Sequence, residues 1–289
     1  ADTYADVLLT DGGLRVVPPD RPEGREIAHL SDEEGAPLYT FVERPDGYLL
    51  RFHGTCEFSI ALDLSRVLYA GDPGADPELI PVLVNGMLVS FLLTLAGSPV
   101  LHASAVDVGG RAIAFTGWSG MGKSTAATLV CADGGLLITD DVLRVDLDPA
   151  GPVCRLGATE ARLRAKAIDL ATAVGSTART TADGRHAVAP AVSLHDRLPL
   201  GALVVPVPDP QARELILLPV QGAESLLTLA RFPRIVGWTD QETNATQFRF
   251  LADVVRRVPV FIATIPWGPP FAPGLGAAIA AAAGAPIQH

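Results

Sequence analysis

The chain has 289 residues, 48% of them hydrophobic, so it is long enough to bury an ample core as one large or two moderate domains. Its formal net charge is −10 and it contains no run of Lys and Arg, which argues against binding to nucleic acid or to an anionic membrane. Its three cysteines are widely spaced and its N-terminus shows no secretory signal, which predicts no zinc site or disulfide framework and favours a cytoplasmic protein.

The first part of the chain has the pattern of a small β-rich module. Short strand-like runs such as Leu14–Val17 alternate with turn signals such as Gly12–Gly13. The apolar stretch Pro81–Ala96 is too short to span a membrane, and it predicts a core helix. We therefore expect an N-terminal β-rich module over residues 1–98 that ends in a helix, and an α/β domain over residues 99–289.

The most informative motif is GWSGMGKS at residues 117–124, which matches the phosphate-binding pattern G-x-x-x-x-G-K-[ST] at every fixed position. A strand-like run, Arg111–Thr116, precedes it, and helix formers follow over Lys123–Ala132. The glycines let backbone N–H groups surround an anion, at which the helix aims its positive dipole end. Lys123 is then placed to reach the β- and γ-phosphates, and the Ser124 hydroxyl to ligate Mg²⁺. We assign nucleotide binding to Gly117, Ser119, Gly120, Met121, Gly122, Lys123, Ser124 and Thr125.

Two further features are predicted to meet this loop at one edge of a sheet. The run Val108-Gly109-Gly110-Arg111 predicts a two-residue hairpin, and its register places His102 opposite Gly117. A one-residue bulge would turn His102 to the other face. After the helix, Leu136–Asp141 has the pattern of a buried parallel strand with two carboxylates at its carboxyl end. A right-handed connection returns that end to the side of the phosphates.

The run LHASAV at residues 101–106, the phosphate loop and Thr139–Asp141 have the order and spacing seen in the HPr kinase/phosphorylase family. The chain most closely resembles the HPr-kinase-related branch, and the resemblance is most specific over residues 99–145. It implies a P-loop kinase core with ATP and Mg²⁺ as cofactors, an active-site histidine at His102, paired catalytic aspartates at Asp140 and Asp141, and a homo-oligomer. Family members phosphorylate a serine hydroxyl on a small protein, and some related enzymes modify the C-terminal serine of ribosomal peptides.

The predicted reaction is ATP-dependent transfer of the γ-phosphate to a hydroxyl, on Ser or Thr of a peptide or small protein or on a small-molecule alcohol. We expect Asp141, oriented by His102, to be the catalytic base, and Asp140 to bind Mg²⁺ together with Ser124. The two aspartates can exchange roles, because adjacent strand residues point to opposite faces. A P-loop ATPase or GTPase without an acceptor, or a nucleotide-gated binding module, remains the alternative, and a preference for ATP or GTP is not encoded in the loop.

Later segments supply positive charge and the rest of the sheet. A cluster of cations, Arg155, Arg162, Arg164 and Lys166, precedes residues 171–190, which have the composition of a mobile loop able to close over an acceptor. Arg185 is the preferred catalytic cation in that loop. Strands are predicted at Leu203–Val207, Leu215–Pro219 and Val260–Ile265, and Trp267 after the last of them either packs in the core or walls the site.

Overall fold

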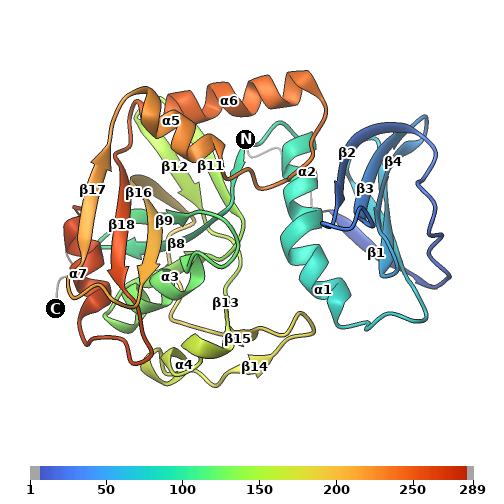
Figure 1. Ribbon diagram of the computed structural model, residues 1–289. Helices are drawn as coiled ribbons and strands as arrows, with labels where there is room; N and C mark the ends of the chain where they lie inside the picture. Colours follow the sequence, from blue (N-terminus) through green and yellow to red (C-terminus); the bar gives the residue numbers. More distant parts are fainter. Residues whose placement is uncertain (1–6, 285–289) are drawn as a thin grey trace. The chain divides into compact units, whose positions relative to one another are not determined.

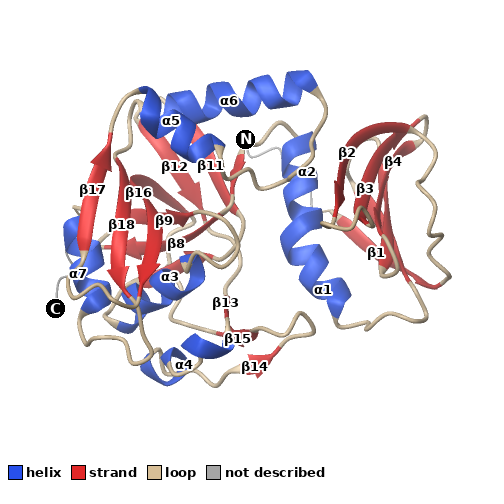
Figure 2. Ribbon diagram, viewed as in Figure 1, coloured by secondary structure: helices blue, strands red, loops and turns tan. Residues whose placement is uncertain are grey.

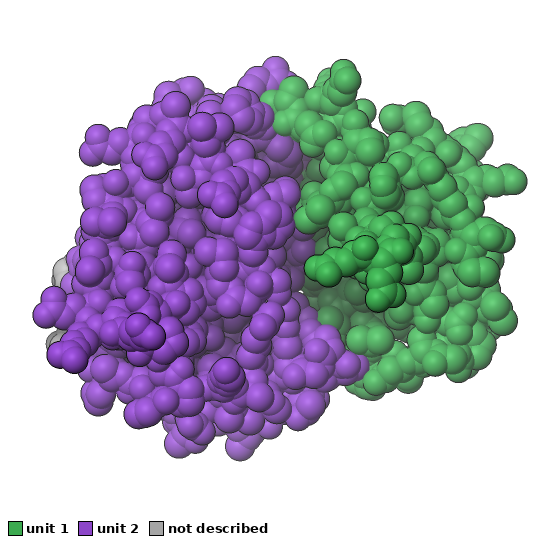
Figure 3. Space-filling view, in the orientation of Figure 1, with its two compact units in different colours: residues 1–96, 235–246 green, residues 97–234, 247–289 purple. Residues whose placement is uncertain are grey.

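The computed structural model describes residues 7–284 and has a mixed α/β fold with several sheets (Figure 1). The chain divides into two compact units, one of residues 1–96 and 235–246 and one of residues 97–234 and 247–289 (Figure 3). The predicted domains, 1–98 and 99–289, place residues 235–246 in the second domain, whereas in the structure this segment belongs to the first unit. Among residues 7–284, no helix is both long and apolar enough to cross a membrane.

The first unit contains a six-stranded sheet in the order β1-β6-β5-β4-β3-β2. Neighbouring strands are antiparallel, apart from β1 and β6, which are parallel. A continuous helical segment follows, and within it Phe91 packs against Phe41 and Trp238 with ring centroids 4.6 and 5.7 Å apart. The elements are β1 Leu8–Leu14, β2 Arg25–Ser31, β3 Pro37–Arg44, β4 Gly47–Phe52, β5 Cys56–Ala61, β6 Arg66–Gly71, α1 Leu79–Leu83, a π-helical turn Val84–Leu88 and α2 Val89–Leu95.

Two local predictions for the first unit were wrong. Gly12 and Gly13 lie inside β1, where the pairing with β6 shifts between Asp11 and Leu14, so they form an irregularity of the strand in place of a turn. The strand predicted over Leu14–Val17 does not form, because only Leu14 belongs to a strand, as the last residue of β1. Residues 237–239 lie along β2: the His29 N–H donates to the Gly237 carbonyl and the Thr239 N–H to the Ile27 carbonyl.

The second unit contains a nine-stranded sheet, in which seven strands follow the order β10-β8-β9-β16-β12-β11-β7. The strand β18 pairs with β16, and β17 pairs with β18 (Figure 2). The strands β9, β16 and β18 are parallel to one another, so their carboxyl ends lie at the same edge. The bounds are β7 Val100–Leu101, β8 Ala103–Val108, β9 Arg111–Thr116, β10 Leu136–Thr139, β11 Leu143–Asp148, β12 Gly151–Arg155, β16 Arg197–Asp209, β17 Ile216–Val220 and β18 Val260–Pro266.

Helices cover both faces of this sheet. Side chains of α3 and α7 share one buried cluster with Ile113 and Phe115, and side chains of α5 and α6 share another with Ala112 and Ala114 on the opposite face. The alternation of these four β9 residues between the two clusters follows from the period of two along a strand. The helices are α3 Lys123–Ala132, α4 Leu170–Ala173, α5 Ala223–Ala230, α6 Gln241–Val255 and α7 Leu275–Ala282.

The structure corrects two further predictions. The strand predicted over Leu136–Asp141 ends at Thr139, and its direct neighbour is β8, to which it is antiparallel. Because β8 is antiparallel to β9 as well, β10 still has the same direction as β9, with β8 inserted between them. Residues 171–190, expected to be a loop, contain the end of α4 and the strands β14 Arg179–Thr180 and β15 His186–Val188, which form a small sheet with β13 Ala161–Leu163.

Candidate functional site

A glycine-rich loop, residues 117–122, connects β9 to α3 in the second unit. Gly117, Gly120 and Gly122 have φ values of +154°, +92° and +84°, in the region that L side chains rarely adopt. Gly122 is the N-cap of α3 and its Cα faces Trp267: an added Cβ would lie 2.4 Å from Cη2 of the indole. Glycine is therefore required there by conformation and by space. The loop leaves the first N–H groups of α3 available to an anion.

Lys123 and Ser124 begin α3 and turn toward this loop and the acids. The Lys123 ammonium is buried and donates to the carbonyls of Gly117 at 2.8 Å and Trp118 at 3.1 Å. Burial lowers the pKa of Lys123 to about 8, with Arg185 adding to the effect and the two aspartates opposing it. The Ser124 hydroxyl donates to Asp140 Oδ1 at 2.8 Å. The first two residues of the helix thus supply one cation and one hydroxyl.

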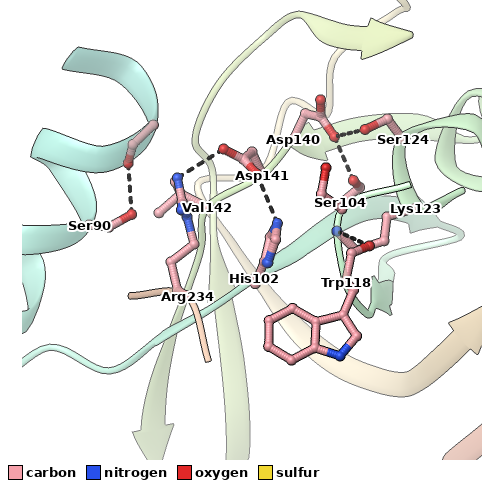
Figure 4. A network of polar contacts seen from close by, with 12 residues as sticks. Ser90, His102, Ser104, Trp118, Lys123, Ser124, Asp140, Asp141, Val142 and Arg234 are labelled. Atoms are coloured by element: carbon pink, nitrogen blue, oxygen red, sulfur yellow. Dashed lines mark hydrogen bonds and ion pairs between the residues drawn. The ribbon is translucent and has the colours of Figure 1, made fainter. Parts of the chain in front are cut away.

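Asp140 follows β10 directly and is buried among hydrogen-bond donors. Its Oδ1 accepts from Ser124 and from Ser104 of β8 (Figure 4). Its Oδ2 accepts from the backbone N–H of Arg162 at 2.9 Å. No group of three or more His, Cys, Asp or Glu side chains within residues 7–284 is arranged to hold a metal ion. The Asp140 carboxylate and the Ser124 hydroxyl are oxygen donors of the kind that Mg²⁺ takes in small number when phosphates complete its shell.

Asp141 belongs to a different network, although it is the next residue. Its Oδ1 accepts from His102 Nε2 at 3.1 Å, and its Oδ2 pairs with Arg234 at 2.9 Å (Figure 4). The same Oδ2 also pairs with Arg162 at 3.3 Å. Asp141 has φ +72°, a left-handed conformation that interrupts the alternation of a strand. This conformation explains how adjacent carboxylates engage separate partners on one side of the sheet, where a regular pleat would separate them.

The charge states of this pair follow from its neighbours. Burial by itself would raise the pKa of Asp141, but the hydrogen bond from His102 and the charge of Arg234 outweigh burial and hold it well below the usual value. Burial lowers the pKa of His102, even though Asp141 opposes the shift. The favoured state at neutral pH is an ionised Asp141 that accepts a hydrogen bond from a neutral imidazole. The Oδ1 atom of Asp141 keeps a lone pair that can accept a further hydrogen bond.

These groups surround one cavity of about 380 Å³. Its lining consists of His102, Ser119, Gly120, Gly122, Lys123, Ser124, Thr125, Asp141, Arg162, Arg164, Ala165, Lys166, Ala167, Arg185 and Trp267. Arg185 extends from the small sheet and donates to the Ser119 hydroxyl at 3.2 Å. The cavity is rich in cations although the whole chain carries a net charge of −10. A volume of this size and a lining rich in cations suit a phosphorylated small molecule.

The structure brings together most of the residues predicted from the sequence. Asp140 does not line the cavity, but it is hydrogen-bonded to Ser124, which does. Gly117 and Met121 are also not among the lining residues, and the Met121 sulfur accepts from the Trp118 N–H. Of the cation cluster, Arg155 lies elsewhere and pairs with Asp146. Sequence reasoning gave no site role to Arg234, which is 93 residues from Asp141; the only signal was that the family resemblance extends loosely over residues 232–238.

Comparisons with known proteins give little further information. No family model matches the chain, and no curated protein matches it. Among solved structures, the chain is similar to the Hpr(Ser) kinase/phosphatase from Coxiella burnetii, with 11% sequence identity and a TM-score of 0.31 over 59% of this chain and 87% of that one. The similarity is weak, and no argument about the site is drawn from it.

Proposed function

We propose that the second unit is an ATP-dependent phosphotransferase with a P-loop core of the HPr-kinase type, acting on a hydroxyl of a peptide, a small protein or a small-molecule alcohol. The observation that carries this proposal is the division of labour between two adjacent aspartates. Asp140 is bonded to the hydroxyl that begins α3, and Asp141 is bonded to an imidazole and two arginines. A simple nucleotide binder has no need of the second network.

The proposed roles follow from these contacts. The N–H groups of the glycine-rich loop and the Lys123 ammonium hold the β- and γ-phosphates, and Ser124 and Asp140 hold Mg²⁺, which neutralises charge on these phosphates. Asp141 accepts the proton of the acceptor hydroxyl while the acceptor oxygen forms its bond to the γ-phosphorus and the bond to the β,γ-bridging oxygen breaks. The products are ADP and a phosphate ester.

The arginines complete this scheme. Arg162 and Arg234 contact Oδ2 of Asp141 and leave its other oxygen to His102, so the ionised form is stabilised and the carboxylate is fixed in orientation. Arg185 lies beside Ser119 and is placed to neutralise charge on the transferring group. We place the reaction in the cytoplasm, where Mg²⁺ and ATP are abundant and thiols such as the unpaired Cys56, Cys131 and Cys154 stay reduced.

The test is transfer of label from [γ-³²P]ATP, with Mg²⁺, to a panel of Ser- and Thr-containing peptides and small alcohols. The proposal predicts a labelled phosphate ester with the wild-type protein, none with Lys123→Ala, and none with Asp141→Asn although that variant still binds ATP. Release of labelled inorganic phosphate as the sole product would identify an ATPase instead. ATP that binds tightly and stays intact with every acceptor would identify a nucleotide-gated binding module.

A further inference from the structure

Trp267 occupies a fixed position at the edge of the sheet from which the glycine-rich loop leaves. It follows β18 directly, and its backbone N–H donates at 3.0 Å to the carbonyl of Asp209, the last residue of β16. Since β9, β16 and β18 are parallel, Trp267 and the loop that follows β9 lie at the same carboxyl edge. Ligands of open α/β sheets bind at this edge.

The indole of Trp267 is held from two sides. Its benzo ring touches the Gly122 backbone so closely that no side chain fits there, and Phe271 packs against it edge-on, with centroids 5.4 Å apart and an angle of 86°. The ring is partly exposed and lines the cavity. A rigid aromatic ring that walls a polar cavity is a platform for a planar group.

The rest of the lining divides the cavity chemically. His102, Asp141 and Arg162 form the network of the proposed reaction, and Lys123 and Ser124 begin α3. Ala165 and Ala167 contribute short apolar side chains, which leave room for a flat group. Trp267 has the largest aromatic ring system in this lining, whose other aromatic side chain is His102.

We propose that Trp267 is the nucleobase subsite: the base of the bound nucleoside triphosphate stacks on the indole, with Ala165 and Ala167 completing the apolar wall. This inference rests on the proposed function, because it requires that the loop hold the triphosphate. Stacking uses the π-face that every base presents, so the subsite strengthens the binding of ATP and GTP alike. It adds affinity for the base to a loop that grips only phosphates.

The test compares ligands with and without a base. Dissociation constants of Mg-ATP and Mg-tripolyphosphate are measured by calorimetry for wild type, Trp267→Leu and Trp267→Phe. Loss of stacking is expected to weaken Mg-ATP binding roughly five- to 150-fold in Trp267→Leu, from the usual cost of deleting a stacked aromatic residue. Mg-tripolyphosphate binding should be unchanged, and Trp267→Phe should restore most of the Mg-ATP affinity.

Phe248 on α6 provides a control outside the loop. Its side chain is 49% exposed and does not line the cavity, so Phe248→Leu should leave the ratio of the two dissociation constants unchanged. The inference is overturned if Trp267→Leu weakens both ligands equally, which would make Trp267 a support of the loop, or if Phe248→Leu alone changes the ratio. If wild type binds neither ligand, the proposed function fails together with the subsite.

A second measurement needs no variant and therefore does not depend on how Trp267→Leu folds. Stacking changes the emission of the indole, so at saturation Mg-ATP should quench the tryptophan fluorescence of the wild-type protein more than Mg-tripolyphosphate does, because Trp118 in the loop can respond to phosphates alone. Equal quenching by both ligands, or by neither while both bind, would contradict the proposed stacking.

Discussion

Replacement of Gly122 by alanine tests the contact on which the shape of the site depends. The residue has φ +84°, and a left-handed backbone costs an L residue about 1–2 kcal/mol. The new methyl would lie 2.4 Å from Cη2 and 2.8 Å from Cζ2 of Trp267, whose ring is backed by Phe271. Overpacking of this kind typically costs about 1–3 kcal/mol. Together, these effects should lower the free energy of unfolding by about 2–5 kcal/mol.

The assay is urea denaturation followed by circular dichroism, with Gly120→Ala as the matched control. Gly120 has φ +92°, but its added methyl would meet only the far end of the flexible Arg164 side chain, so this variant should lose only the conformational part. Gly122→Ala should cost less when it is added to Trp267→Leu than when it is added to the wild type. The difference should be the overpacking part, about 1–3 kcal/mol. Equal losses in the two glycine variants, or no recovery in the double variant, would refute the placement of Trp267 against the loop.

Three further predictions concern the proposed chemistry. Because the pKa of Lys123 is lowered to about 8, the ammonium is present below that pH and is lost above it. The affinity for Mg-ATP, measured by calorimetry from pH 6.5 to 9, should therefore fall by up to about tenfold per pH unit above pH 8. The affinity of Lys123→Arg should not change over the same range. Ser124→Ala should weaken ATP binding in the presence of Mg²⁺ but not in EDTA, and equal losses in both buffers would exclude the hydroxyl as a metal ligand. His102→Ala should slow transfer, by up to about 10²–10⁴-fold if orientation of the base is lost, while the dissociation constant of ATP stays the same; an equal loss of both would make the imidazole a structural residue.

The hairpin before the loop was predictable in detail, because a two-residue Gly-Gly turn fixes its own register. The predicted hairpin is confirmed: Val108 pairs with Arg111 and Ser104 with Phe115, and the ladder reaches Ala103 opposite Thr116. His102 lies one residue beyond that ladder, between β7 and β8, and the Thr116 hydroxyl donates to its carbonyl. Local turn chemistry was therefore sufficient to bring the imidazole to the loop.

The arrangement of the acids was not predictable from local patterns. A regular strand would direct Asp140 and Asp141 to opposite faces, and only the positive φ at Asp141 lets both carboxylates take part in one site. A sequence pattern carries no signal for such a backbone state in an aspartate, because several residue types tolerate turns. The role of Arg234 was not predicted for a different reason: Arg234 lies 93 residues from Asp141 in the sequence, after α5, and no periodicity connects the two residues.

Tertiary pairing also overturned two predictions about longer segments. Small and polar residues at 171–190 predict a loop, but two short strands form there because β15 pairs with both β13 and β14. Residues 235–246 lie in the sequence between two stretches of the second unit, yet the backbones of Gly237 and Thr239 bond to β2. Gly237 shows why this pairing is specific, since an added Cβ would lie 1.7 Å from the His29 carbonyl oxygen.

A crystal structure of the protein with Mg²⁺ and a non-hydrolysable ATP analogue tests the central claim most directly. The account predicts β- and γ-phosphates in the loop at residues 117–124, the metal on Ser124 and Asp140, and the Asp141 carboxylate beside a space about 3–3.5 Å from the γ-phosphorus, in line with the bond to be broken. A nucleotide bound with Asp141 on the side of the leaving group, or outside the cavity, would contradict phosphoryl transfer by these residues.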